Sequence, residues 1–406
     1  MDFEDTPDEA AFRAQACSWL AEHAELKVVA PGPQGVGDSD PEAELLHVKR
    51  SKEWQRTLYE GGWAGITWPR SFGGRGGTAV EAMIFAQEQA RFDVPGTVFA
   101  QGIGMAGPTL MAYGTPDQQD RFLPPMLRGD DVWCQLFSEP GSGSDLASLS
   151  TRADLDGDEY VVNGQKVWTS SAHFSDWGIL LARTDFDAPK HKGITYFLLD
   201  MRTPGIEIRP LRQATAASHF NEVFLNDVRI PAGNVVGAPN DGWRVTITTL
   251  SNERMFIGGA TSASDPFAGL AALAAGGRSR DPVLRQELTQ AYIRLQVIRY
   301  LSWRVQTAVS KGRQPGPESS VLKLAVSRHQ GRTGDLIMAI LGAEGTLLDY
   351  GDPADYSWQL QFVSQWSSRI GGGTEQVQRN IIGERVLGLP GEPRIDKDGS
   401  FRAPAR

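Results

Sequence analysis

The chain has 406 residues, 40% of them hydrophobic and 9% aromatic, and a formal net charge of −9. This length is sufficient for two or three domains with a large core, and the negative charge argues against a nucleic-acid partner, since phosphate backbones require clustered Lys and Arg. The two cysteines, Cys17 and Cys134, support neither a disulfide framework nor a zinc site. We expect a cytoplasmic protein without membrane insertion, because the acidic N-terminus lacks the pattern of a signal peptide and no apolar stretch is long enough to cross a bilayer.

The N-terminal part, residues 1–130, is predicted to be an α-helical domain. Three capping boxes begin at Thr6, Thr78 and Thr115, each with Glu or Gln three residues later and an apolar helical pattern behind it. A segment rich in Pro and Gly, residues 30–38, separates the first helix from the second.

The middle part, residues 131–236, is predicted to be a β domain, because its short runs of Val, Ile, Tyr and Phe are divided by turn residues. Asn163-Gly164 lies between two such runs and predicts a two-residue hairpin turn. Further strands are expected at 178–182, 195–199, 206–208 and 223–228.

The C-terminal part, residues 237–406, is predicted to be a helical bundle domain. Helical periodicity returns at 241–260, 282–311, 317–341 and 375–386. The stretch 261–280 is rich in Ala, Ser and Gly and is interpreted as a loop. The order of helices, strands and helices predicts an α+β chain.

A small glycine loop near the start of the β domain carries groups suited to a polar heterocycle or a phosphate. It begins at Phe137-Ser138 and continues through Gly143-Ser144. Hydroxyl and backbone N–H groups in such a loop can face an anion. Taken alone, the loop could equally be an ordinary Ser/Gly turn.

A tryptophan with hydroxyl neighbours follows about 25 residues later. Trp168 precedes Thr169, Ser170 and Ser171. A tryptophan on a strand is usually a core residue, but three successive hydroxyl residues beside it are unusual for a core strand. The segment is therefore a candidate aromatic wall with hydrogen-bonding groups at its edge.

Two segments of the C-terminal part also carry polar groups. Residues 371–373 are three glycines ahead of Thr374 and Gln376, which indicates a helix entry with Thr374 as N-cap, a place that favours an anionic cofactor. Glu253 and Arg254 lie in the helix expected at 241–260; such a pair usually lies on a solvated helix face.

Together these segments resemble the acyl-CoA dehydrogenase family, flavin enzymes that desaturate acyl thioesters, and the resemblance extends over nearly the whole chain. It implies an α+β fold with an N-terminal helical domain, a middle β-barrel domain and a C-terminal four-helix bundle, with FAD between the β domain and the bundle. It implies Trp168 against the flavin ring and Ser170 near its reactive nitrogen. The residues that the resemblance assigns to the cofactor are Phe137, Ser138, Gly143, Ser144, Trp168, Ser170, Thr374 and Gln376.

The resemblance is interrupted at one catalytic position, where many members have glutamate and this chain has Gly372. The α-proton of a thioester is weakly acidic, so its removal needs a positioned base, worth about 10²–10⁴ in rate. Gly372 cannot supply it, although its N–H could hold the thioester oxygen. Glu253 matches the glutamate of the branch that includes isovaleryl-CoA dehydrogenase. We expect Glu253 as the base, Gly372 as a catalytic amide, and Ser144, Arg254 and Gly371 as substrate contacts.

The part of the FAD site that a neighbouring subunit supplies differs from the family pattern. Residues 278–286 lack the motif Arg-x-x-Phe-Gly, and residues 339–345 lack a Gln and one Gly; Arg278 or Arg280 is expected to substitute. The partners that the resemblance implies are an acyl-CoA substrate, an electron-transfer flavoprotein, and either a homo-oligomer (dimer or tetramer) or a mixed tetramer.

Three alternatives are compatible with the sequence: a subunit of a heteromeric acyl-CoA dehydrogenase with an incomplete FAD site, a same-fold flavoenzyme with different chemistry, and a non-enzymatic binding module. Glu253 argues against the second, and the two flavin-facing segments argue against the third. The glycines at 371–373 could admit a branched or ring-bearing acyl group, or could serve only backbone geometry. No metal site is predicted, because none of the six histidines stands in a ligand pattern.

Overall fold

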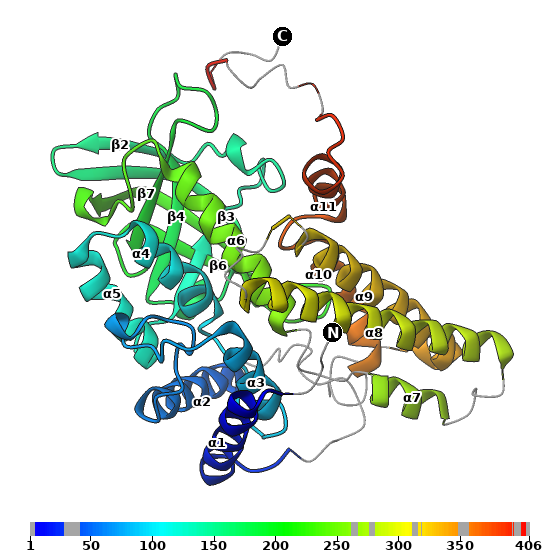
Figure 1. Cartoon of the computed structure of the whole chain (residues 1–406). Coiled ribbons are helices and arrows are strands. Elements are labelled where there is room, and N and C mark those ends of the chain that lie inside the picture. The colour runs from blue at the N-terminus through cyan, green and yellow to red at the C-terminus, as the bar shows by residue number, and fades with distance from the viewer. Residues whose placement is uncertain are drawn as a thin grey trace.

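The chain folds as a group of helices, a sheet and a second group of helices, in that order (Figure 1). The computed structural model describes residues 5–27, 41–260, 267–275, 281–310, 316–317, 319–347, 357–391, 393 and 399–402. This order confirms the predicted α+β arrangement.

The N-terminal helices begin where the sequence places their caps. Thr6, Thr78 and Thr115 each accept a hydrogen bond from the backbone N–H three residues later, and the side chain at that later position accepts one from the threonine N–H. All three predicted capping boxes are therefore confirmed. The elements of this part are α1 (Pro7–His23), α2 (Pro41–Glu60), η1 (Arg70–Phe72), α3 (Ala79–Gln89), the π-helical η2 (Gly102–Ala106), α4 (Gly107–Tyr113) and α5 (Pro116–Arg128).

A single seven-stranded sheet forms the middle of the chain, with the order β1-β4-β2-β3-β7-β6 and with β5 paired to β4. Its two most buried strands, β4 and β5, alternate between two cores. Ile179 and Leu181 face the core shared with the N-terminal helices, whereas Leu180 and Ala182 face the interior of the curled sheet. The elements are β1 (Trp133–Leu136), η3 (Leu146–Ser148), β2 (Arg152–Asp156), β3 (Glu159–Ser170), η4 (Ala172–Phe174), β4 (Trp177–Arg183), β5 (Ile194–Asp200), β6 (Ile206–Leu211), β7 (Phe220–Pro231) and η5 (Ala232–Asn234). The four further strands expected from the sequence are confirmed.

The hairpin predicted at Asn163-Gly164 is wrong. Both residues lie inside β3, and the turn that joins β2 to β3 contains Gly157, with φ +67°. Gly164 instead lets β3 pass close to Thr151, whose Oγ1 would lie 2.5 Å from a Cβ at position 164. Asn163 reaches across to β7, where it exchanges two hydrogen bonds of 2.9 and 3.0 Å with Asp227. The Asn-Gly pair is typical of a turn in the sequence, but here the glycine is required by the close packing of β3 on Thr151.

The C-terminal helices pack side by side, and α6 (Gly242–Ala260) runs between the sheet and the other helices (Figure 1). It contacts β5, α4 and η2 and also contacts α9. The remaining elements are α7 (Phe267–Ala275), α8 (Pro282–Ser310), α9 (Ser319–Leu341), η6 (Gly342–Thr346), α10 (Ser357–Ile370), α11 (Glu375–Ile381) and the π-helical η7 (Ile382–Val386).

Two of these helices differ from the sequence-based expectation. The predicted loop at 261–280 contains the helix α7, so this prediction is wrong for residues 267–275. Helix α10 has no counterpart among the predicted helices, because its buried Gln359 and Gln365 interrupt the apolar pattern. Among the described residues, none of the helices combines the length and the apolar character that a membrane crossing requires.

Candidate functional site

The two polar segments of the sheet domain, predicted to face a cofactor, lie side by side. The N–H of Val167 donates to the carbonyl of Ser138 at 2.9 Å. The ammonium of the next residue back, Lys166, is fully buried and donates to the carbonyl of Phe137 at 3.0 Å and to Glu139 Oε1 at 2.8 Å. The end of β1 is therefore fixed to β3 immediately ahead of Trp168.

Glu139 is the centre of this junction, and both of its carboxylate oxygens accept hydrogen bonds. Besides Lys166, it accepts from the backbone N–H groups of Ser150 at 2.7 Å and Thr151 at 2.9 Å. Burial pushes the pKa of Glu139 upward, but the Lys166 ammonium and these hydrogen bonds outweigh it and hold the pKa at about 2. Burial lowers the pKa of Lys166, and the Glu139 carboxylate opposes this. The pair is ionic at neutral pH and joins the two segments.

Trp168 is held in a conformation that a bulky residue rarely adopts. Its φ is +60°, it lies in a register shift between β3 and β7, and its side chain is 61% exposed. Ser171, three residues on, is also left-handed, with φ +62°. Phe220 packs against the indole in a T-shaped arrangement, with the ring centroids 6.0 Å apart. Strain of this kind persists only where the surroundings impose it and is common at binding sites. The result is a large aromatic side chain left mostly exposed near the end of β3.

The hydroxyl groups around Trp168 fit a flavin. Within the described residues, the half-buried hydroxyls of Ser138 and Ser170 have no hydrogen-bond partner, and the buried hydroxyl of Thr169 has none either. Gly143 and Ser144 are exposed, and a Cβ at Gly143 would meet no atom within 4 Å. An aromatic face with unused donors and open space beside it suits a planar, polar heterocycle. The side chain of Phe137, in contrast, lies in the core against Tyr196.

Helix α6, which carries Glu253, is anchored by a buried group of hydroxyls. Thr249 Oγ1 lies 2.9 Å from Thr109 Oγ1 of α4 and 3.3 Å from the hydroxyl of Tyr196 on β5. All three side chains are almost fully buried. Thr249 is one helical turn ahead of the half-buried Glu253, and residues four apart lie on one helix face. The contacts therefore anchor α6 one helical turn ahead of Glu253.

Replacing Thr249 with Val is expected to lower the free energy of unfolding by about 1–3 kcal/mol, because the buried Tyr196 hydroxyl loses this partner. Chemical denaturation of the variant measures the loss. Thr289→Val on α8 is the matched control, since Thr289 is exposed and only bonds the carbonyl of Arg285 in its own helix. Equal stability of the two variants would show that the hydroxyl group does not anchor α6.

The glycine turn after α10 is held by side chains that the sequence analysis missed. Gly372 and Gly373 have φ of +63° and +87°. Gln378 Nε2 donates to both of their carbonyls, at 3.1 and 3.3 Å, and Lys323 Nζ donates to the Gly373 carbonyl at 2.7 Å. Thr374 caps α11 by accepting from the N–H of Val377 at 3.2 Å, which confirms the predicted N-cap.

Lys323 also connects the glycine turn with Glu253. Burial lowers the pKa of Lys323, while the carboxylates of Glu375 and Glu253 raise it. The Lys323 ammonium is therefore hydrogen-bonded to the glycine turn and also feels the charge of Glu253, whose helix α6 contacts α9. Within the described residues, no hydrogen bond or ion pair joins this group directly to the Trp168 segment.

Gln376 is exposed, and two other predicted site residues lie wholly or partly outside what the structure describes. Gln376 is exposed on α11, whereas Gln378, which was not predicted, is buried. Arg278 lies outside the described residues, and so does the side chain of Arg254. The described part of the chain contains no group of three or more His, Cys, Asp or Glu side chains that could hold a metal ion.

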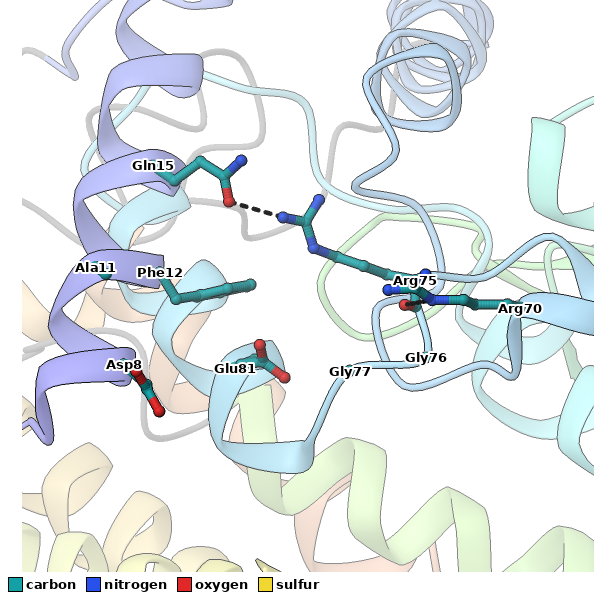
Figure 2. A pocket seen from close by; sticks show the side chains of 9 residues that line it. All are labelled: Asp8, Ala11, Phe12, Gln15, Arg70, Arg75, Gly76, Gly77 and Glu81. Carbon is teal, nitrogen blue, oxygen red and sulfur yellow. Dashed lines mark hydrogen bonds between the residues drawn. The ribbon is translucent and has the colours of Figure 1, made fainter.

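A separate cavity of about 430 Å³ lies among the N-terminal helices, between α1 and the loop that follows η1 (Figure 2). Arg75 crosses it, stacks on the rings of Phe12 and Trp63, and donates to Gln15 Oε1 at 2.8 Å. The lining residues are Asp8, Ala11, Phe12, Gln15, Arg70, Arg75, Gly76, Gly77 and Glu81. None of the predicted cofactor or substrate residues is among them, so this cavity is not the candidate active site.

Comparison with known proteins accounts for all three parts of the chain. Family models for the N-terminal, middle and C-terminal domains of acyl-CoA dehydrogenases match residues 36–130, 134–228 and 240–387. The acyl-CoA dehydrogenase IpdE1 of Mycobacterium tuberculosis is 40% identical over 391 residues, which cover 95% of this chain and 99% of that protein. The chain belongs to the acyl-CoA dehydrogenase family. This confirms the resemblance inferred from the sequence and makes the protein an oxidoreductase.

Other members of the acyl-CoA dehydrogenase family agree with this assignment. FadE34 of Mycobacterium tuberculosis is 43% identical over 348 residues, which cover 86% of this chain but 47% of that longer protein. The solved structure of the Tcur3481-Tcur3483 steroid ACAD superposes with a TM-score of 0.79 at 30% identity and covers 97% of this chain and 100% of its own. The predicted acyl-CoA dehydrogenase fold is thereby confirmed, with N-terminal, middle and C-terminal domains. Members of this family are FAD-dependent flavoproteins, whereas the roles of Glu253 and Gly372 stay predictions.

Proposed function

We propose that the chain catalyses the FAD-dependent α,β-dehydrogenation of an acyl-CoA with a branched or ring-bearing acyl group and passes the electrons to an electron-transfer flavoprotein. The observation that carries this proposal is the arrangement around Lys323, which relates Glu253 of α6 to the glycine turn after α10. A carboxylate beside a turn with an unused backbone N–H supplies both groups that α-proton removal requires.

FAD would be held at the sheet by the indole of Trp168 and by the hydroxyls of Ser138 and Ser170. The exposed indole and the unused hydroxyls are the observations that fit it. Gly143 and Ser144 would contact it from the glycine loop, and Thr374, Gln376 and Arg278 from the bundle side. When bound, FAD supplies a hydride acceptor for the β-carbon.

The chain's own residues would perform the proton chemistry. Glu253 would take the α-proton as the C–H bond breaks, and its carboxylate would become a carboxylic acid. The N–H of Gly372 would donate a hydrogen bond to the thioester oxygen, where negative charge develops in the transition state. Ser144, Arg254 and Gly371 would contact the substrate.

The substrate class follows from the glycine turn and from the relatives. The three glycines at 371–373 place no side chain at the turn, and Gly371 is exposed. A solved relative is named a steroid ACAD, so a bulky acyl group is accepted within the same architecture. We therefore expect a ring-bearing acyl-CoA to react faster than a straight-chain acyl-CoA.

A second candidate is that the chain is one subunit of a mixed tetramer. The Tcur3481-Tcur3483 structure and the ChsE4-ChsE5 structure from Mycobacterium tuberculosis are both complexes of two named components, and the latter superposes with a TM-score of 0.78 at 29% identity over 97% of this chain and 100% of its own. The departures from the family pattern at 278–286 and 339–345 favour the same assembly.

The test is the visible spectrum of the chain expressed alone, with FAD counted per chain after release. About one FAD per chain would support a homo-oligomer, and little FAD would support the mixed tetramer.

The FAD-loaded form, alone or with its partner subunit, is then mixed anaerobically with acyl-CoA thioesters. We expect loss of the flavin absorbance and formation of an enoyl-CoA. A flavoprotein that no acyl-CoA reduces would contradict the proposed function.

A further inference from the structure

A buried lysine lies beneath the glycine turn, at a place that no sequence motif indicated. Lys323 of α9 is 7% exposed. Its ammonium donates to the carbonyl of Ser368, at the end of α10, at 2.9 Å and to the carbonyl of Gly373 at 2.7 Å. A buried ammonium group is costly unless it is hydrogen-bonded or paired, so these two carbonyls define a built position for the charge.

The contacts with Lys323 determine which groups of the turn stay available. The carbonyls of Gly372 and Gly373 are both engaged, by Gln378 and Lys323. The N–H of Gly371 donates to the carbonyl of Ser367 at 2.8 Å. The N–H of Gly372, in contrast, has no acceptor among the described residues. The turn thus keeps the carbonyls of Gly372 and Gly373 inside the protein and leaves the N–H groups of the same two residues without an acceptor among the described residues.

The charges around Lys323 come from three other helices. Glu253 lies on α6 and Glu375 on α11, two helices that both contact α9, and the charge of each carboxylate raises the pKa of Lys323. Glu375 is already paired with Arg369 of α10 at 3.0 Å and with Arg379 at 3.5 Å. The second carboxylate, Glu253, is the proposed base. A fixed positive charge beside a carboxylate keeps it ionised and able to accept a proton.

We propose that Lys323 is a positioning residue for the dehydrogenation: it fixes the glycine turn so that the Gly372 N–H is presented to the thioester oxygen, and it places a positive charge on the helix that packs against α6, which carries Glu253. The inference rests on the proposed function. In this proposal Lys323 contacts neither the substrate nor FAD. It acts through two other groups, the N–H of Gly372 and the carboxylate of Glu253.

The test compares Lys323→Met, which removes the charge at similar length, with Lys323→Arg, which keeps it. In the FAD-loaded enzyme, Lys323→Met is expected to lower kcat roughly 100-fold, as a displaced catalytic group does, with KM and FAD content little changed. The acidic limb of kcat/KM against pH moves to higher pH, because protonation of Glu253 becomes easier without the cation. Lys323→Arg recovers most of kcat. Lys49→Met, at an exposed position of α2, is the matched control.

A second measurement does not depend on turnover. Hydrogen–deuterium exchange of the peptide that contains residues 368–374 is expected to speed up in Lys323→Met and to stay near wild type in Lys323→Arg. Unchanged kcat, pH profile and exchange in a folded Lys323→Met would overturn the inference. So would loss of FAD and rate together without rescue by Arg, which would indicate a merely structural residue. If no acyl-CoA reduces the flavin of the wild-type enzyme, the proposed function is wrong, and the inference, which depends on it, is wrong as well.

Discussion

Glu253→Gln is expected to lower kcat/KM for acyl-CoA by about 10²–10⁴-fold, the usual contribution of a positioned general base, and to leave the FAD content unchanged. Gln has nearly the same shape but cannot accept the α-proton at neutral pH. The helix that carries it remains anchored through Thr249, so neither fold nor cofactor site should change. Anaerobic stopped-flow measurement of flavin reduction detects the effect directly, because it observes the step in which the α-proton leaves.

The matched control is Glu287→Gln, which removes the same charge from an exposed position on another helix of the C-terminal part, α8. It should reduce the flavin at the wild-type rate. If Glu253→Gln reacts as fast as this control, Glu253 is one of the solvated Glu-Arg pairs common on helix surfaces, and the base must come from another residue.

The fold could be predicted in outline from the sequence because many of its signals are local. A capping box needs only residues three apart, and all three at Thr6, Thr78 and Thr115 are present. The errors arise where tertiary contacts override the local pattern. Asn163-Gly164 has the composition of a turn, yet its glycine serves the approach of β3 to Thr151. Helix α10 was missed because two of its buried positions are glutamines, whereas helical periodicity predicts apolar residues at buried positions.

The candidate site was predicted only where its residues form short segments. The glycine loop, the Trp168 segment and the turn at 371–373 each occupy a few consecutive residues. The residues that hold these segments were missed, because their partners are distant in sequence. Lys323 bonds carbonyls 45 and 50 residues away, and Thr249 bonds a hydroxyl 140 residues away. Neither carries a local pattern, since a lysine or a threonine on a helix is ordinarily a surface residue.

Lys166→Met is expected to lower the free energy of unfolding by about 3–5 kcal/mol, because it leaves the buried carboxylate of Glu139 without its counter-charge. It should also reduce FAD retention, since Lys166 holds the carbonyl of Phe137 beside β3. Chemical denaturation and the FAD count measure the two effects. Lys190→Met is the control: its partner Asp145 is 60% exposed, and an ion pair with an exposed partner contributes roughly 0–1 kcal/mol.

The double variant Lys166→Met/Glu139→Gln distinguishes the destabilisation caused by an unpaired buried carboxylate from the destabilisation caused by lost packing. Because neither position 139 nor position 166 then carries a charge, and Gln can still accept from Thr151, it should recover much of the loss. The pH dependence gives an independent test. The pKa of Glu139 is about 2 in the folded chain against 4.5 for a free glutamate, so its stabilisation is complete above about pH 4.5 and is lost as the pH falls toward 2. Wild type should therefore lose more stability than the double variant across this interval. Parallel curves would mean that Glu139 is not held as an ion, and the junction between the two cofactor-facing segments would then depend on hydrogen bonds alone.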